Sequence, residues 1–197
     1  MSTPRLLLSR QVLALHGDAL RDATAGAALD FVVLEDAHAD ATVTVDAAFI
    51  SRDITGQSTK HVAQTTLLNC YAVLRRSPGL AWVHTHSAGA DRSIYAELMA
   101  RNVAVTTSSG ANAQVVAHTA LAGLLALARR FPALMQAQRE HRWAPLQAGP
   151  APRDLAGQTA VLVGWGPIAR ALQPLLALLG MAEIGRASCR ERVCMLV

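Results

Sequence analysis

One stretch of this sequence joins a strand, a glycine turn and a helix without interruption. Thr159–Val163 is a short apolar run of the kind that forms a buried strand. The turn Gly164–Ala169 follows directly, and an apolar-periodic stretch then extends to Gly180. A G-x-G-x-x-A string in this context is typical of dinucleotide binding, whereas the string alone is weak evidence. The alternative interpretation is an ordinary turn between a strand and a helix in an α/β protein that binds no nucleotide.

Each residue type in this turn has a physical role if a pyrophosphate binds there. Gly164 permits a tight turn, Gly166 lets the backbone approach the phosphates, and Ala169 is small enough for the helix to pack on the strand. Pro167 suits the first turn of a helix, where its missing N–H costs nothing. The helix N-terminus then offers free N–H groups to an anion. The turn therefore predicts a dinucleotide site.

Composition is that of a globular protein and narrows the range of partners. Of the 197 residues, 52% are hydrophobic and 16% are charged, which excludes a disordered chain. The net charge of +4 comes from scattered arginines without a basic run, so we expect no nucleic-acid partner. No apolar stretch is long enough to span a bilayer, and the three cysteines make neither a disulfide framework nor a metal cluster. We expect a cytoplasmic protein without a membrane segment.

The first half of the chain alternates short apolar runs with helix-compatible stretches. The predicted strands are Arg5–Leu8, Leu29–Leu34, Ala47–Ser51, Leu80–Val83 and Asn102–Thr106. The predicted helices are Gln11–Ala25, Gln64–Arg75 and Arg92–Arg101, with Cys70 as a small buried hydrophobe in the second. Strands that alternate with helices indicate βαβ units and a parallel sheet.

A polar segment, His84–Asp91, follows the fourth of these strands. It lies at the carboxyl end of a predicted parallel strand, where open α/β sheets bind ligands. Its Ser-Ala-Gly turn offers unobstructed backbone N–H groups that suit a small carboxylate. His84 and His86 point to opposite faces of an extended chain and lack a third ligand, so we reject a metal site. Asp91 is as suited to capping the next helix as to chemistry.

A long helix predicted at Ala113–Arg130 is apolar on almost every side. Such a helix is buried between two bodies or against a partner subunit, and His118 on it is interpreted as a core or interface residue rather than a catalyst. The proline-containing segment Phe131–Arg153 is interpreted as an arm or linker before the body that contains the glycine turn.

Three blocks of this sequence resemble the D-isomer-specific 2-hydroxyacid dehydrogenases. They are WVHTHSAGAD, NVAVTTSSGANAQVVAHTALAGLLALAR and DLAGQTAVLVGWGPIARALQPLLALLGM, in this order along the chain. The resemblance implies an α/β fold, with a flavodoxin- and Rossmann-like parallel-sheet substrate domain followed by the truncated start of a Rossmann dinucleotide-binding domain. It also implies NAD or NADP as cofactor, a small 2-oxo or 2-hydroxy acid as substrate, hydride transfer between the two, and a homodimer.

The resemblance also assigns site residues. Ala88 and Gly89 fall on the loop whose backbone binds the substrate carboxylate in that family. Asn112–Arg130 resembles the linking helix, which lies near the dimer interface. The cofactor loop takes in Gly164, Gly166, Pro167, Ile168 and Ala169.

Two features depart from the family pattern. Pro174 lies inside the predicted helix after the turn, where an interior proline kinks a helix at a cost of about 3 kcal/mol. The string EIGRASCRERV, which begins at Glu183, resembles the translation of a common sequencing adapter. We therefore expect native sequence to stop near Met181 or Ala182, with a divergent second strand from Met181 as the alternative. The expected parts are a substrate domain at 1–111, a linking helix and arm at 112–153, the start of the NAD(P)-binding domain at 154–182, and a non-native tail at 183–197.

No catalytic residue is assigned in this sequence. The family's catalytic arginine, its acid-orienting glutamate and its general-acid histidine lie downstream of the glycine turn and have no counterpart here. We therefore expect the 197-residue chain to show no hydride transfer with NADH or NADPH and glyoxylate or hydroxypyruvate. Oxidation of the reduced cofactor by the purified chain would contradict this. The alternative function is a non-enzymatic α/β module that binds a small carboxylate or has a regulatory role.

Overall fold

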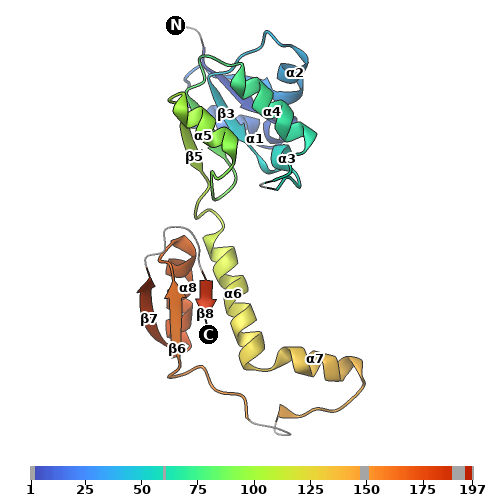
Figure 1. The fold of residues 1–197 in the computed structure, drawn as a ribbon, viewed down its shortest axis with the longest axis vertical. Helices are drawn as coiled ribbons and strands as arrows, with labels where there is room; N and C mark the ends of the chain where they lie inside the picture. The colour runs from blue at the N-terminus through green and yellow to red at the C-terminus, as the bar shows by residue number, and fades with distance from the viewer. Residues whose placement is uncertain (1–2, 60, 147–150, 188–193, 197) are drawn as a thin grey trace. The chain divides into compact units, whose positions relative to one another are not determined.

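The chain folds into two compact units, residues 1–109 and residues 110–197. The structure is a computed structural model and describes residues 3–59, 61–146, 151–187 and 194–196 (Figure 1).

The first unit is built on a five-stranded sheet with the order β2-β1-β3-β4-β5. Its strands are β1 (Arg5–Leu8), β2 (Asp30–Val33), β3 (Ala47–Ile50), β4 (Trp82–Thr85) and β5 (Ala104–Thr107). Every neighbouring pair is parallel, which confirms the predicted α/β parallel sheet. The chain moves outward from β1 in both directions, to β2 on one side and to β3 on the other. In such sheets ligands bind beyond the carboxyl ends of the strands, where the order reverses.

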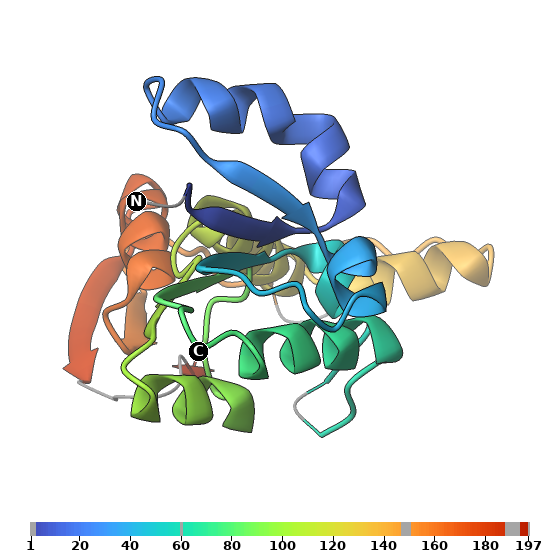
Figure 2. The same cartoon turned by 90° about the horizontal axis from the view of Figure 1, so that it is seen from above.

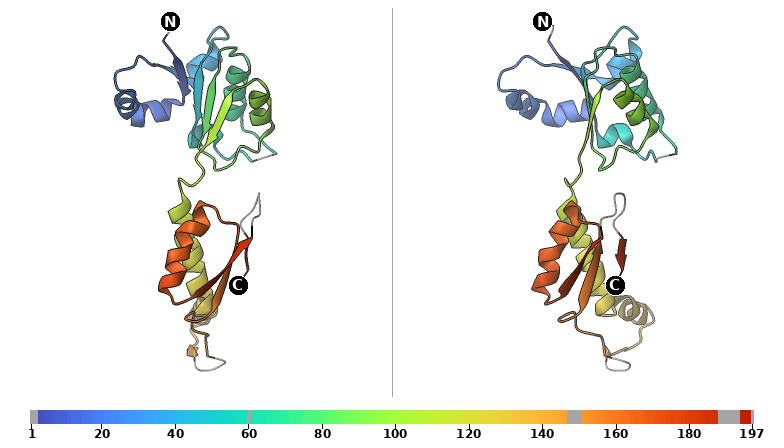
Figure 3. Two further views of the ribbon diagram at one scale, coloured as in Figure 1. Left: turned by 90° about the vertical axis from the view of Figure 1, so that its left-hand side faces the viewer. Right: turned by 60° about the vertical axis from the view of Figure 1, so that its left-hand side comes forward.

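Helices cover the two faces of this sheet unequally. Helix α1 (Arg10–Ala23) lies on one face, and α2 (Leu34–Ala39), α4 (Thr65–Arg75) and α5 (Ser93–Ala100) lie on the other (Figures 2 and 3). The short helix α3 (Arg52–Thr55) contacts α4. The core lies between the sheet and the helices α2, α4 and α5. Ile50, Val83, Leu74 and Leu98 are completely buried there. Residues of β3 and β4 that point to the other face, such as Phe49 and Trp82, stay partly or largely exposed.

Helix α4 shows how the apolar period becomes core packing. Leu67, Tyr71 and Leu74 are buried and Cys70 is fully buried among them, whereas Leu68 is 51% exposed. Burial raises the pKa of the Cys70 thiol to about 12, so the thiol stays protonated and behaves as the small hydrophobe that the sequence predicted. After the helix, the buried Ser77 hydroxyl accepts the Val45 N–H, so the turn is also tied into the core.

The second unit packs two helices against a short sheet. Helices α6 (Ala113–Ala128) and α8 (Pro167–Leu178) contact each other, and β6 (Thr159–Val163) lies beside α8 (Figure 1). Strand β7 (Ala182–Ala187) pairs with β6 in parallel, and β8 (Cys194–Leu196) pairs with its other edge antiparallel. One core joins Leu124 of α6, Leu162 of β6 and Leu172 of α8.

Helices α7, α2 and α3 differ from the sequence predictions. The segment interpreted as an arm contains α7 (Phe131–Arg139), which has a proline in its first turn, where proline favours a helix. Helices α2 and α3 were not predicted, because six and four residues are too few to show a helical period. Helix α8 contains Pro174 in its interior, as the sequence predicts, and extends on both sides of it.

Two strands fall within the segment that resembles an adapter translation. Strand β7 has the geometry of the alternative, a second strand after Met181 that runs parallel to the first. Residues 188–193 and 197 of this segment lie outside the described residues. Backbone pairing is independent of how a sequence arose, so the non-native origin of residues 183–197 stays a prediction.

Helix α6 is less buried than its composition predicts. Ala113, Ala117 and Leu124 are buried, whereas the side chains of Val115 and Leu127 are 67% and 69% exposed. None of the helices in the described ranges is both long and apolar enough to cross a membrane. Helix α6 thus exposes large apolar side chains near both of its ends.

Candidate functional site

The glycine turn connects β6 to α8 as the sequence predicts. Gly164 is buried and has a φ of +95°, a left-handed conformation that a side chain would strain. Gly166 is the N-cap of α8, and Pro167 begins the helix. Ala169, one turn into the helix, is 1% exposed in the core shared with β6 and α6, so its small size serves close packing.

Neither conformation nor packing requires glycine at position 166. Its φ of −82° is open to any residue, and an added Cβ would meet no atom within 4 Å. The missing side chain instead leaves the backbone accessible. The N–H groups of Ile168 and Ala169 lie in the first turn of α8, where a helix has no internal acceptor for them. An open backbone beside these N–H groups and the positive end of the helix dipole fits a pyrophosphate.

The loop that leads into α6 supports this turn. Gly110 has a φ of +89°, and an added Cβ would lie 3.2 Å from the side chain of Pro167. A larger residue at 110 would therefore push against the start of α8. The backbone of this loop and the first turn of α8 are packed together within the second unit.

Ala88 and Gly89 lie on the loop that follows β4 in the first unit. Both are exposed, and an added Cβ on Gly89 would meet no atom within 4 Å. The base of the loop is fixed, because the Ser108 N–H donates to the carbonyls of Thr85 and Ser87, each at 3.1 Å. An accessible backbone on a fixed base is the arrangement that a carboxylate-binding loop needs.

Hydrogen bonds connect both ring nitrogens of His84 to hydroxyl groups of the neighbouring strand and the residue after it. The Ser108 hydroxyl donates to the Thr85 carbonyl at 3.3 Å and is hydrogen-bonded to Nε2 of His84 at 3.0 Å. Nδ1 of His84 is hydrogen-bonded to the Thr106 hydroxyl at 2.8 Å, and Thr106 accepts from the Trp82 indole N–H at 2.9 Å. The network fixes Ser108 and thereby the base of the loop.

His86 is a residue to which the sequence assigned no role. Its Nε2 atom is buried and has no hydrogen-bond partner; among the described side chains only the Tyr71 hydroxyl shares this state. Desolvation lowers the pKa of His86, and the charges of Arg52 and Arg92 lower it further. No sequence signal marks this group, because Arg52 and His86 follow different strands.

Two other sequence candidates, Asp91 and His118, have different surroundings from those expected. The N-cap of α5 is Arg92, so Asp91 does not cap that helix. His118 is exposed on α6 and is therefore not a core residue; an interface role for it stays a prediction. His84 and His86 have different neighbours, and within the described ranges no group of three or more His, Cys, Asp or Glu side chains could hold a metal.

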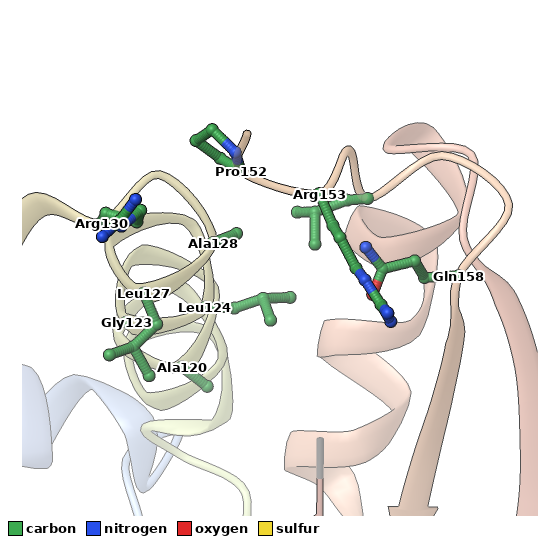
Figure 4. Close-up of a pocket in the computed structure, with 10 residues that line it drawn as sticks. Ala120, Gly123, Leu124, Leu127, Ala128, Arg130, Pro152, Arg153 and Gln158 are labelled. Carbon is green, nitrogen blue, oxygen red and sulfur yellow. The ribbon is translucent and has the colours of Figure 1, made fainter. Parts of the chain in front are cut away.

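A groove of about 550 Å³ lies in the second unit between α6 and the segment before β6 (Figure 4). Its lining is mostly apolar and consists of Ala120, Gly123, Leu124, Leu127, Ala128, Arg130, Pro152, Arg153, Leu155 and Gln158. Gln158 immediately precedes β6, whereas the glycine turn follows it. The groove is therefore at the opposite end of the strand from the turn and is not the candidate cofactor site.

Comparison with known proteins identifies the family to which the glycine turn relates. Residues 121–193 match the family model of the D-isomer specific 2-hydroxyacid dehydrogenase, NAD binding domain. This match includes the whole of the turn and α8. It confirms the resemblance that the sequence blocks predicted.

Solved structures share the fold. A D-isomer specific 2-hydroxyacid dehydrogenase family protein from Aeromonas salmonicida superposes with a TM-score of 0.66 and 21% identity, over 97% of this chain and 56% of its own. A glyoxylate reductase from Paecilomyes thermophila gives 0.59 and 18%, over 92% and 54%. An NAD-dependent formate dehydrogenase from Staphylococcus aureus in complex with NAD gives 0.53 and 19%, also over 92% and 54%. The chain thus spans about half the length of these proteins, and the likeness establishes its Rossmann-like α/β fold.

The two turn glycines predict opposite mutant behaviour. Gly164→Ala is expected to lower the free energy of unfolding by about 1–2 kcal/mol, because alanine resists the left-handed conformation. Gly166→Ala is expected to change stability by less than about 0.5 kcal/mol, because its Cβ meets open space. The same Gly166 variant should weaken NAD binding at least tenfold, since its methyl group occupies the path to the backbone.

Denaturant unfolding and calorimetric titration with NAD would measure these effects. A Gly166→Ala variant that loses as much stability as Gly164→Ala, or that binds NAD like the wild type, would show that the open space does not serve the cofactor.

Proposed function

We propose that this chain forms the N-terminal part of an NAD(P)-dependent dehydrogenase that interconverts 2-oxo acids and D-2-hydroxy acids. The observation that carries the proposal is the glycine turn, with an open backbone at Gly166, inside the segment that matches the NAD-binding domain of that family. The matched family model describes an NAD-binding domain. The proposal includes NADP as well, because pyrophosphate binding at the glycine turn does not depend on the residue that reads the ribose.

Each unit would hold one reactant. The N–H groups at the start of α8 would hold the cofactor pyrophosphate, aided by the helix dipole of about half a positive charge. When bound, the nicotinamide cofactor supplies or accepts the hydride. The loop at Ala88 and Gly89 would bind the carboxylate of the 2-oxo acid through backbone N–H groups. The network from Trp82 to Ser108 would keep that loop in a single conformation.

The full reading frame that contains this chain tests the proposal. With NADH or NADPH, its product is expected to reduce pyruvate or hydroxypyruvate, and the hydroxy acid formed should be the D enantiomer alone, as chiral chromatography would determine. Formation of the L enantiomer would overturn the proposal. Binding of these acids without turnover would favour the alternative, a module that binds a small carboxylate.

We also propose that the enzyme is a homodimer with α6 and α7 at its interface. The two helices expose large apolar side chains, namely Val115, Leu125, Leu127, Phe131 and Met135. Trp143, which follows α7, is 89% exposed. Large exposed apolar side chains often belong to protein interfaces, and the family resemblance favours a second copy of the same chain as the partner.

Leu127→Glu is expected to raise the dimer dissociation constant at least tenfold, because a carboxylate would be buried in an apolar contact. Gln114→Glu, an exposed polar position on the same helix, is the matched control and should dissociate like the wild type. Sedimentation velocity would measure both. A wild-type chain that stays monomeric at micromolar concentration, or equal dissociation constants for the two variants, would contradict the dimer.

A further inference from the structure

The carboxyl edge of the first unit's sheet holds basic groups to which the proposed function assigns no role. Ile50 ends β3 and Thr85 ends β4, and the two residues are paired in register. The residues that follow these strands are therefore neighbours at the same edge. The backbone N–H of His86 donates to the Ile50 carbonyl at 2.9 Å. Arg52 follows β3 by two residues. His86 itself lies two residues before Ala88, so this edge adjoins the candidate carboxylate loop.

His86 needs a hydrogen-bond partner that the described protein does not supply. Nearly all buried polar atoms in folded proteins have a hydrogen bond, yet Nε2 of His86 is buried without one. His86 as a residue is only partly buried, and Ala88 and Gly89 beside it are exposed, so a ligand can reach this edge. An acceptor atom of a bound molecule would complete its bonding.

The charges that face His86 are positive on balance. Arg52 and Arg92 are its basic neighbours, and Asp53 is its acidic one. The Arg92 guanidinium is fixed, because it donates to the carbonyls of Thr59 and Ser58. A fixed cation beside an imidazole is a poor arrangement for stability alone, but it favours an anion.

Arg52 and Asp53 do not neutralise this edge through each other. Partial burial opposes ionisation of Asp53, but hydrogen bonds from Ser51, at 2.6 Å, and Ser9 lower its pKa on balance, so it stays a carboxylate. Its charge is thus directed toward serine hydroxyls. Arg52 is exposed, and no ion pair or hydrogen bond of its guanidinium occurs within the described ranges. Arg52 is therefore available to a ligand.

We propose that Arg52, Arg92 and His86 recognise a second anionic group, carried on the side chain of the 2-oxo acid. The inference rests on the proposed function, in which the backbone at Ala88 and Gly89 binds the first carboxylate. A guanidinium at Arg52 matches a carboxylate or a phosphate in two parallel hydrogen bonds. Arg92 adds a fixed charge, and Nε2 of His86 adds one hydrogen bond. The substrate class is then a 2-oxo dicarboxylate or a phosphorylated 2-oxo acid, in preference to pyruvate or glyoxylate.

NMR titration of the 197-residue chain tests the inference without any catalytic turnover. The His86 imidazole resonance would be followed against pH with pyruvate, with 2-oxoglutarate and with 3-phosphohydroxypyruvate. We expect one of the two acids that carry a second anionic group to bind at least tenfold more tightly than pyruvate. Its binding should also raise the pKa of His86, since a bound anion stabilises the imidazolium. Whichever of the two binds more tightly identifies the second group as carboxylate or phosphate.

Two arginine variants complete the test. Arg52→Gln is expected to remove the tenfold preference while pyruvate binding stays the same. Arg139→Gln, an exposed arginine at the end of α7, makes the same change of charge and should retain the preference. Equal binding of all three acids by the wild type, or a preference that survives in Arg52→Gln, would overturn the inference and leave the proposed function standing. Failure of all three acids to bind would count against the inference and the proposed function together.

Discussion

Parallel strand pairing is the constraint on which the site of the first unit depends. Because all five strands run in one direction, their carboxyl ends meet at one edge, and the register decides which residues become neighbours there. Ser9 and Ser51, which follow β1 and β3, have their hydroxyl oxygens 3.4 Å apart. A shift of one residue would turn every side chain to the opposite face of the sheet. Burial of Ile50 and Val83 on one face therefore also fixes the polar groups that follow them.

The elements that the sequence predicted well are those with a strong local signal. The strands of the first unit are apolar runs with clear turns between them, and the sequence from Thr159 to Ala169 combines strand, turn and helix within a few residues. Helix α7 was interpreted as an arm because prolines surround it, although Pro132 is in the one helical turn that accepts proline. The wide exposure of α6 could not be predicted, because an apolar helical sequence does not show whether another part of the same chain covers the helix.

The two candidate sites also differ in how well the local sequence reveals them. The glycine turn could be found from sequence because its residues are consecutive and each has a local reason. The His84 network depends on Thr106 and Ser108, which come from the next strand, and His86 depends on Arg52, which comes from the preceding one. Such groups are brought together only by the sheet, so no spacing along the chain reveals them. Conversely, the structure explains Gly166 better than sequence does, since only three dimensions show that the protein leaves the space beside it empty.

The core of the second unit joins segments on either side of a long connection. Leu124 of α6 packs with Leu155 and Leu172, although the chain between α6 and Leu155 passes through α7 and the arm. The entropy of closing such a loop grows only with the logarithm of its length, so doubling it costs about 0.6 kcal/mol. Insertions or deletions in the arm are therefore cheap for the fold. The arm can therefore differ in length and chemistry, and with it the surface around Trp143, without a change in the packing of Leu124 with Leu155 and Leu172.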